Sequence, residues 1–334
     1  MLHSTTYKLN RGAQVMKNNL TYLLIAMLLL VLAACGGDDT AADTADQPEE
    51  TDTATTEEEA EEAKTAEETE ALETNGDIIA TTVALVEIMD ALELDLVGVP
   101  STYKDLPERY DGLPEVGMAM SPDMERILSL KPTEVLTVTT LTDYVEETFT
   151  ETDTPATYMD LESVEGMYDG IQSLGEKYDR REQAEQLVST FEEKLTEIET
   201  KIEGKESPKV LILLGVPGSY LVATENSYVG DLVKRAGGLN AIEDTDLEYV
   251  QANTETLQQA DADIILRMAH GMPEEVVEMF DKEFQENDIW SHFKAVKDDR
   301  VYDLEEERFG TTANLAAADA LEELIGMFYP DLAE

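Results

Sequence analysis

Cysteine is almost absent from this sequence, in which Cys35 is the single thiol. One cysteine cannot form a disulfide within the chain, and it cannot build a cysteine-based metal site. The Cys-x-x-Cys-His pattern of covalent cytochromes is missing as well. Disulfide-stapled scaffolds, thiolate-bound metal sites and covalent cytochromes are therefore excluded.

Histidine is nearly as scarce, with His3, His270 and His292 as the only three. His3 precedes a segment that we expect to be removed, and two remaining imidazoles cannot supply a histidine-rich zinc or manganese site. The Gly-x-Ser-x-Gly, His-Glu-x-x-His and Walker A patterns of common enzymes are also missing. These absences indicate a binding protein rather than an enzyme.

Basic residues are few: 23 lysines and arginines face 74 aspartates and glutamates, for a net charge of −51. A nucleic acid partner requires a basic face that neutralises phosphates, so nucleic acid is excluded as a partner. Net charge keeps a protein soluble. The acidity therefore indicates a saline or alkaline habitat for an exported protein.

The N-terminus has the features of a lipoprotein signal peptide, which we expect to span residues 1–34. An apolar run over residues 23–34 follows Lys17 and is shorter than the roughly 20 residues that a hydrocarbon core requires. The run ends in Leu-Ala-Ala-Cys, which resembles the bacterial lipobox, so Cys35 is the predicted site of lipidation by a palmitate-type anchor. Met16 is the expected start of translation.

Residues 35–75 are expected to form a disordered tether behind the lipidated cysteine. Between residues 38 and 73 the chain holds 16 acidic residues, one lysine and no aromatic residue. Such a segment cannot bury enough apolar surface to offset the entropy of ordering, and its like charges repel one another. The sequence therefore predicts an extended spacer between membrane and folded body.

In the rest of the chain, short β-rich runs alternate with amphipathic segments, which predicts parallel α/β units. Ser121 and Pro122 have the residue types of an N-cap and a first helical position, and Pro273 also occupies a first helical position. The strands are expected over 77–82, 95–100, 134–140, 209–215, 261–269 and 300–305. The helices are expected over 83–94, 121–132, 227–238 and 272–284, with a terminal helix from Thr312.

One long charged and amphipathic stretch interrupts this rhythm and contains no convincing strand. The predicted organisation is an N-terminal lobe over 76–162, a connecting helical region over 163–205 and a C-terminal lobe over 206–334. The predicted fold class is α/β, with two Rossmann-like lobes joined by a single long backbone helix. A single connector of this kind implies little hinge closure.

Open α/β sheets bind ligands outside the carboxyl ends of their strands. His270 follows an expected strand, and Met120 lies in the loop before an expected helix. Each lobe therefore offers one nitrogen or sulfur ligand at the edge that faces the other lobe.

Five segments of the sequence resemble the heme-binding lipoproteins of iron-regulated surface determinant systems. These segments are GVPGSYLVAT (215–224), YVGDLVKRAGG (228–238), LRMAHGMPEEV (266–276), NDIWSHFKAVK (287–297) and VYDLEEERFG (301–310). Members of that family are the substrate-binding components of heme importers of the ATP-binding-cassette (ABC) type. The resemblance implies the class III arrangement of periplasmic binding proteins, with heme b as the transported ligand.

The resemblance implies that Met120 and His270 are the axial ligands of the heme iron, with Met118 as an open alternative to Met120. Imidazole and thioether are both accepted axial ligands. The N-terminus of the helix expected from Val83 offers free N–H groups at Val83 and Ala84 for a heme propionate.

Thr102, Tyr103 and Lys104 add polar donors for the propionates, and the resemblance implies propionate contacts in the same loops. Tyr220 and Val222 are weaker candidates for contact with the porphyrin face, and packing of a turn explains them equally well.

The resemblance also implies partners. The permease and ATPase of a heme importer are expected to receive the heme, through contacts of Glu125 and Glu255 with the permease, and cell-wall heme proteins are expected to donate it. The protein is expected on the extracellular face of the cell membrane, held there by its lipid.

The alternative is a ferric-siderophore or cobalamin carrier of the same fold. Anionic siderophores usually require an arginine-rich cleft. The available arginines, Arg109, Arg180, Arg181 and Arg267, show no cluster in the sequence.

Overall fold

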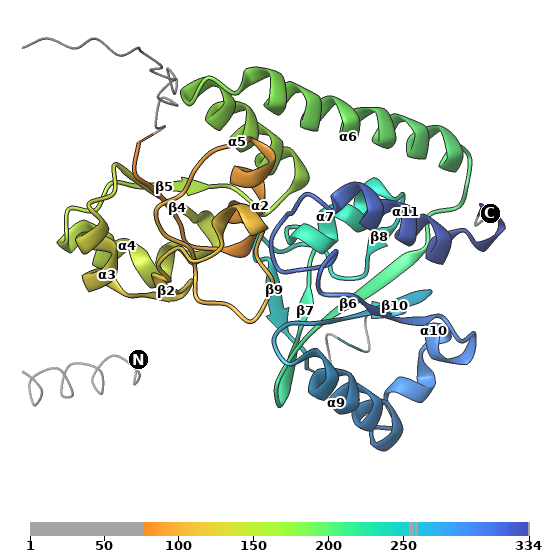
Figure 1. Cartoon of the computed structure of the whole chain (residues 1–334). Helices are drawn as coiled ribbons and strands as arrows, with labels where there is room; N and C mark the ends of the chain where they lie inside the picture. Colours follow the sequence, from red (N-terminus) through yellow and green to blue (C-terminus); the bar gives the residue numbers. More distant parts are fainter. Residues whose placement is uncertain (1–75, 254–256, 258–259, 333–334) are drawn as a thin grey trace, which may run out of the picture. The chain divides into compact units, whose positions relative to one another are not determined.

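A computed structural model describes residues 76–253, 257 and 260–332. The predicted signal peptide, Cys35, the acidic tether and Glu255 lie outside the described residues. The described residues form two α/β lobes beneath a long helix (Figure 1), which confirms the predicted fold class.

The N-terminal lobe is built on three parallel strands in the order β1-β4-β5. All residues of β1 and β4 are buried, as expected for parallel strands that are covered on both faces. Its strands are β1 (Ile78–Ala80), β4 (Glu134–Val138) and β5 (Ala156–Met159), and its helices are α2 (Val83–Ala91), α3 (Met124–Leu130) and α4 (Thr142–Glu151), with 3-10 turns η1 (Glu108–Tyr110) and η2 (Thr139–Leu141).

The helix predicted from Ser121 begins later than expected. Ser121 and Pro122 form strand β3 (Ser121–Pro122), which pairs antiparallel with β2 (Gly117–Met118). Helix α3 begins at Met124 and is capped by Asp123, whose side chain accepts a hydrogen bond from the Arg126 amide. Gly117 has a φ of +93°, and a Cβ there would lie 2.6 Å from the Asp123 nitrogen. The hairpin therefore depends on glycine at this position.

The C-terminal lobe contains a mixed sheet in the order β11-β10-β6-β7-β9, with β8 also paired to β6. Strands β11, β10 and β6 are parallel to one another, whereas β7 is antiparallel to both of its neighbours, β6 and β9. The strands are β6 (Lys209–Val216), β7 (Ser219–Ala223), β8 (Leu239–Asn240), β9 (Tyr249–Gln251), β10 (Ile264–Ala269) and β11 (Val301–Leu304), and the helices are α7 (Tyr228–Arg235), α9 (Pro273–Glu286), α10 (Lys294–Lys297) and α11 (Ala317–Phe328), with 3-10 turns η3 (Trp290–His292) and η4 (Pro330–Leu332).

The predicted helix start at Pro273 is confirmed, because Pro273 is the first residue of α9. Ser227 caps α7 by accepting a hydrogen bond from the Gly230 amide. Strand β7, by contrast, occupies a segment expected to be a loop. Gly218 has a φ of +83° and closes a tight hairpin between β6 and β7.

The connecting region is two helices rather than one. Helix α5 (Val164–Lys177) and helix α6 (Arg181–Ile202) are separated at Asp179, which has a φ of +56°. Helix α6 extends above both lobes in Figure 1. None of the helices in the described part of the chain is both long and apolar enough to span a membrane.

A buried carboxylate attaches this helical connector to the N-terminal sheet. Glu134 on β4 accepts hydrogen bonds from Lys177 (2.6 Å), Thr157 (2.6 Å) and the Tyr178 hydroxyl. Beyond the end of α6, Lys205 pairs with Asp331 beside α11. Ion pairs thus tie the helical connector to the body at the α5–α6 junction and at its C-terminal end.

One apolar core extends through both lobes. It continues from Leu85 on α2 through Met167 on α5 and Phe191 on α6 to Leu232 on α7 and Leu324 on α11. Buried apolar contacts and backbone hydrogen bonds across the same boundary resist separation of the lobes. One such bond joins the Ala313 amide to the Leu161 carbonyl (2.8 Å).

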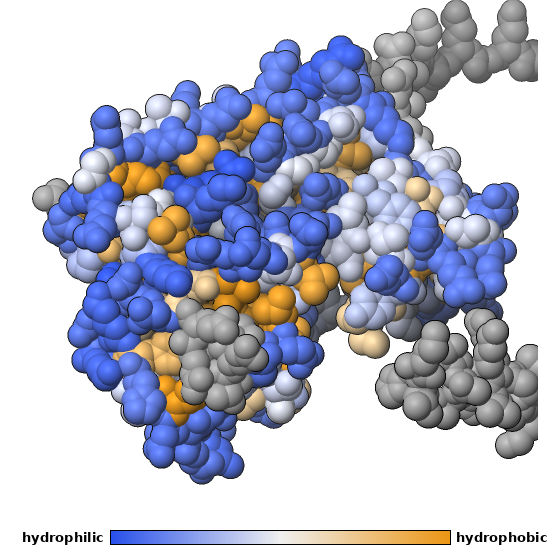
Figure 2. Space-filling view, turned by 180° about the vertical axis from the view of Figure 1, so that it is seen from behind, coloured by the Kyte–Doolittle hydropathy of each residue, from blue (hydrophilic) through white to orange (hydrophobic). Residues whose placement is uncertain are grey.

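The acidic residues lie mainly on the surface. Hydrophilic residues cover most of the face seen in Figure 2, with apolar residues gathered toward its middle. Among the charged residues that the structure describes, only Glu134 and Arg267 are buried. The large negative charge is therefore solvated, and it adds little desolvation cost in the core.

Replacing Glu134 by alanine should lower the free energy of unfolding by about 2 kcal/mol, because three donors lose their acceptor. Burial opposes ionisation of Glu134, but the bonds from Lys177, Thr157 and Tyr178 outweigh it and lower its pKa. The stabilisation by ionised Glu134 is therefore fully present above the pKa that glutamate has in the unfolded chain. It is lost as the pH falls through the lowered pKa of the folded state. Chemical denaturation of Glu134→Ala at pH 7 and at low pH measures both effects.

The matched control is Glu176→Ala, which removes an exposed carboxylate from the same helical region. It should change stability by less than about 0.5 kcal/mol. Equal stabilities of the two variants at pH 7 would contradict the anchoring role of Glu134.

Candidate functional site

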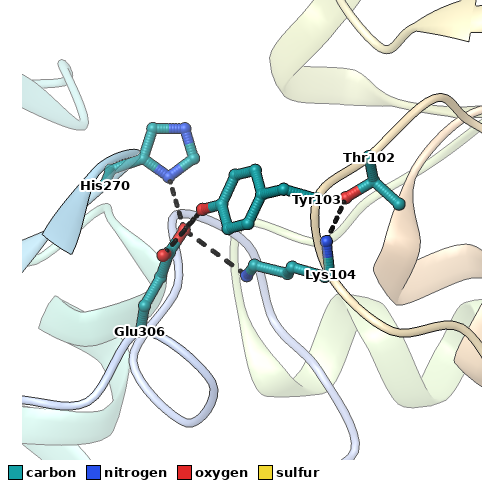
Figure 3. A network of polar contacts seen from close by, with 5 residues as sticks. All are labelled: Thr102, Tyr103, Lys104, His270 and Glu306. Carbon is teal, nitrogen blue, oxygen red and sulfur yellow. Dashed lines mark hydrogen bonds and ion pairs between the residues drawn. The ribbon is translucent and has the colours of Figure 1, made fainter.

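Three polar residues from the two lobes converge on the carboxylate of Glu306 (Figure 3). The Tyr103 hydroxyl lies 2.9 and 2.8 Å from the two Glu306 carboxylate oxygens, and Lys104 Nζ lies 3.4 Å from Oε1. His270 Nδ1 also lies 3.4 Å from Glu306 Oε1. Tyr103 and Lys104 belong to the N-terminal lobe, and His270 and Glu306 to the C-terminal lobe.

The sheet register explains why His270 and Glu306 are neighbours. Strands β10 and β11 are parallel, with Met268 opposite Leu304. The residues two positions further along, His270 and Glu306, therefore leave the sheet side by side at its carboxyl edge. This is the edge at which open α/β sheets bind ligands.

Glu306 is ionised at neutral pH although its side chain is only 9% exposed. Burial alone would raise its pKa, but hydrogen bonds and charges from His270, Tyr103 and Lys104 outweigh burial and lower the pKa to about 2. Burial and the bond to Glu306 raise the pKa of Tyr103 to about 12. The phenol therefore remains protonated and donates its proton to the carboxylate.

Glu306 is not among the site residues predicted from the sequence. Three consecutive glutamates, residues 305–307, follow the expected strand, and nothing in their spacing distinguishes the middle one. The available signal was its position just after a parallel strand, at the same edge as His270.

His270 presents an accessible imidazole nitrogen. Its backbone amide donates to the Gly215 carbonyl (2.9 Å), and its side chain is 51% exposed. Gly271 and Met272 have φ values of +68° and +49°, which turn the chain sharply from β10 into α9. Because Nδ1 faces Glu306, Nε2 points away from the carboxylate (Figure 3). A carboxylate at one ring nitrogen is the usual support for a histidine that binds metal through the other.

Two exposed thioethers lie on the hairpin of the N-terminal lobe. Met118 is on β2 and is 65% exposed, and Met120 is in the turn between β2 and β3 and is 52% exposed. The Ser101 amide donates to the Gly117 carbonyl (2.9 Å), so the hairpin adjoins the loop that carries Tyr103. Apolar side chains of this size are usually covered, and both methionines are available as sulfur ligands.

The start of α2 contributes to the same edge. Thr82 caps the helix, and the amides of Val83 and Ala84 belong to its first turn, which has no intrahelical acceptors. Glu87, one turn further on, has a pKa that is raised by burial and is also influenced by the charges of Lys104 and Glu307. In the neighbouring loop, the Thr102 hydroxyl accepts a bond from the Lys104 amide (3.1 Å).

The structure does not bring Tyr220 and Val222 to this group. Val222 is completely buried with Leu211 and Trp290 in the core between the sheet and α9, so its predicted contact with a porphyrin is wrong. The Tyr220 hydroxyl donates to Glu283 on α9 (2.9 Å). Both residues are on strand β7, whose alternation turns them toward α9 and not toward His270.

Two of the arginines considered for a siderophore, Arg267 and Arg109, are engaged in ion pairs with aspartates. Arg267 is buried and pairs with Asp303 and Asp281, and its guanidinium lies 5.2 Å from the centre of the Phe284 ring. Arg109 pairs with Asp95. Within the described residues, these arginines form no anion-binding cluster beside His270.

Comparisons with known proteins agree with this architecture. A family model described as periplasmic binding protein matches residues 78–307. The high-affinity heme uptake system protein IsdE of Staphylococcus aureus is 49% identical over 255 residues, which cover 76% of this chain and 87% of that protein.

Two solved structures are similar over the same part of the chain. An ABC transporter substrate-binding protein from Listeria monocytogenes EGD-e is 51% identical, with a TM-score of 0.72, and the match covers 76% of this chain and 99% of that one. The S. aureus IsdE structure complexed with heme is 49% identical, with a TM-score of 0.73 and the same coverage. The chain therefore belongs to the periplasmic binding proteins, a family of binding proteins and not of enzymes, and within it to the relatives of IsdE.

Proposed function

We propose that the protein binds heme b with high affinity between its lobes and delivers it to the permease of an ABC importer. The observation that carries the proposal is the half-exposed imidazole of His270, backed by Glu306 at the carboxyl edge of the sheet. The relationship to IsdE, whose solved structure contains heme, supports the same ligand.

In this proposal, His270 Nε2 and the Met120 sulfur bind the heme iron from opposite lobes. A Met/His pair raises the reduction potential of heme iron, and thioether is the softer and weaker of the two ligands. Met118 is the alternative sulfur ligand, since both thioethers are exposed on the same hairpin. One firm and one weak bond suit a carrier that must release its cargo.

The propionates are assigned to the N-terminal lobe. The amides of Val83 and Ala84 lie at a helix N-terminus, where backbone N–H groups and the helix dipole favour an anion. Tyr103 and Lys104 supply a hydroxyl donor and an ammonium, and Thr102 orders the loop between them and the hairpin. These donors give the heme a defined orientation in the cleft.

Delivery is assigned to the outer surface of each lobe. Glu125 is exposed on the first turn of α3, where it is free to contact a permease subunit. Glu255 is the corresponding proposal for the C-terminal lobe. A lipid on Cys35 and the acidic tether would keep the body on the extracellular face of the membrane, between cell-wall heme donors and the permease.

Replacing His270 by alanine should weaken heme binding by more than the roughly 10–100-fold that loss of a supporting residue costs at metal sites. The reason is the loss of the nitrogen ligand itself. Heme titration followed at the Soret band measures the change. His292→Ala is the matched control, because His292 is an exposed histidine of the same lobe, and it should bind heme as wild type does. Equal affinities of the two variants would refute the assignment of His270.

Met120→Ala should retain heme through His270 but shift the iron toward five-coordinate or water-ligated spectra. Met118→Ala, two residues away on the same hairpin, should leave the six-coordinate spectrum intact. Absorption and magnetic circular dichroism spectra distinguish the two. The reverse pattern would move the ligand to Met118.

The doubled variant Glu125→Ala/Glu255→Ala should bind heme normally but fail to stimulate the ATPase of the reconstituted importer. The control is Glu176→Ala/Glu192→Ala, which removes two exposed carboxylates from the connecting helices and should preserve stimulation. Weakened heme binding in the first variant would instead place these glutamates at the ligand site.

A further inference from the structure

The N-terminal donors of the cleft have a protein acceptor. The Tyr103 hydroxyl is bonded to Glu306 although the Tyr103 residue is 69% exposed, and Lys104 Nζ is 3.4 Å from the same carboxylate. Both donors are therefore directed across the cleft to the opposite lobe (Figure 3). They are also the donors to which the proposed function assigns a heme propionate, and the inference below rests on that proposal.

Chemically, Glu306 and a heme propionate offer the same group. A glutamate side chain is itself two methylenes that end in a carboxylate, and it accepts hydrogen bonds at the same distances. The Tyr103 hydroxyl has one proton to donate, so it cannot serve both carboxylates fully. Lys104 has three donors but one charge, which two carboxylates would share.

We infer that Glu306 is an internal substitute for a heme propionate, and that Tyr103 and Lys104 exchange Glu306 for the propionate when heme binds. The exchange breaks and forms hydrogen bonds and ion pairs only. Glu306 retains His270, whose Nδ1 lies 3.4 Å from Oε1, so its carboxylate keeps a partner in the complex.

The exchange has a measurable energetic consequence. If Lys104 is paired before and after heme binding, it contributes little to the affinity, because one charge-assisted contact replaces another. If Glu306 is absent, Lys104 gains a carboxylate partner only in the complex, and its contribution to affinity appears in full. The effect of removing Lys104 must therefore depend on Glu306.

A double-mutant cycle tests this dependence with heme as the titrant and four proteins: wild type, Lys104→Met, Glu306→Gln and the combined variant. With Glu306 in place, Lys104→Met should raise the heme Kd by less than about threefold. In the E306Q background the same change should raise it by about tenfold or more, the value of one contact with a charged group. Any loss of His270 support in E306Q affects both proteins of that background and cancels in the ratio.

A second cycle with Tyr103→Phe in place of Lys104→Met should show the same sign. Glu306→Asp keeps the charge but withdraws the carboxylate by one methylene. In this background, Lys104→Met should raise the heme Kd by a factor between those for the wild-type and E306Q backgrounds. This variant tests the exchange even if E306Q folds poorly. Stopped-flow mixing adds a kinetic readout, because E306Q should accelerate association by freeing both donors in advance.

Heme dimethyl ester, which has no ionised carboxylate, is the control ligand. Lys104→Met should then have the same small effect in both backgrounds. Equal effects of Lys104→Met on heme Kd in the two backgrounds would overturn the exchange while leaving heme binding intact. Absence of any Soret change with wild-type protein would instead overturn the proposed function.

Discussion

The apolar core that crosses the lobe boundary is the constraint on which the rest of the structure depends. It joins α2 of the N-terminal lobe and α5 of the connector to α7 and α11 of the C-terminal lobe, beneath α6. Because this core and the backbone bond from Ala313 to Leu161 fix the lobes, the distance across the cleft is set by packing. The polar network around Glu306 can therefore reach from lobe to lobe with single side chains, without a flexible segment to bring them together.

The strong negative charge of the protein makes the electrostatics of this edge unusual. Glu306 stays ionised in a partly buried position because three donors surround it, and Glu87 and Glu307 lie close enough to influence the neighbouring charges. Lys104 is thus a cation among carboxylates, and for an anionic ligand its position matters more than the total number of lysines in the protein. In a protein with few lysines, the binding of an anionic ligand depends on local donors and helix dipoles rather than on the electrostatic field of the whole protein.

Much of the fold could be predicted because local signals agreed with the tertiary structure. Short stretches of sequence encode the helix start at Pro273 and the buried strands β6 and β10. The helix start at Ser121 was wrong, because the positive φ of Gly117 allows a hairpin that competes for the same residues. His270 could be singled out by its scarcity and its place after a strand. Glu306 could not, because the register between β10 and β11 decides which of three glutamates faces the cleft.

The ion pairs that tie the helical connector to both lobes have a consequence for communication. When a binding protein closes around its ligand, its outer shape changes, and the transporter can recognise the loaded form by that change. In this protein the connector is attached through Glu134 at the α5–α6 junction and through Lys205 and Asp331 at its C-terminal end, so we expect only a small change of outline. We therefore expect empty and loaded forms of similar outline, which a transporter would distinguish by the local surface chemistry between the lobes.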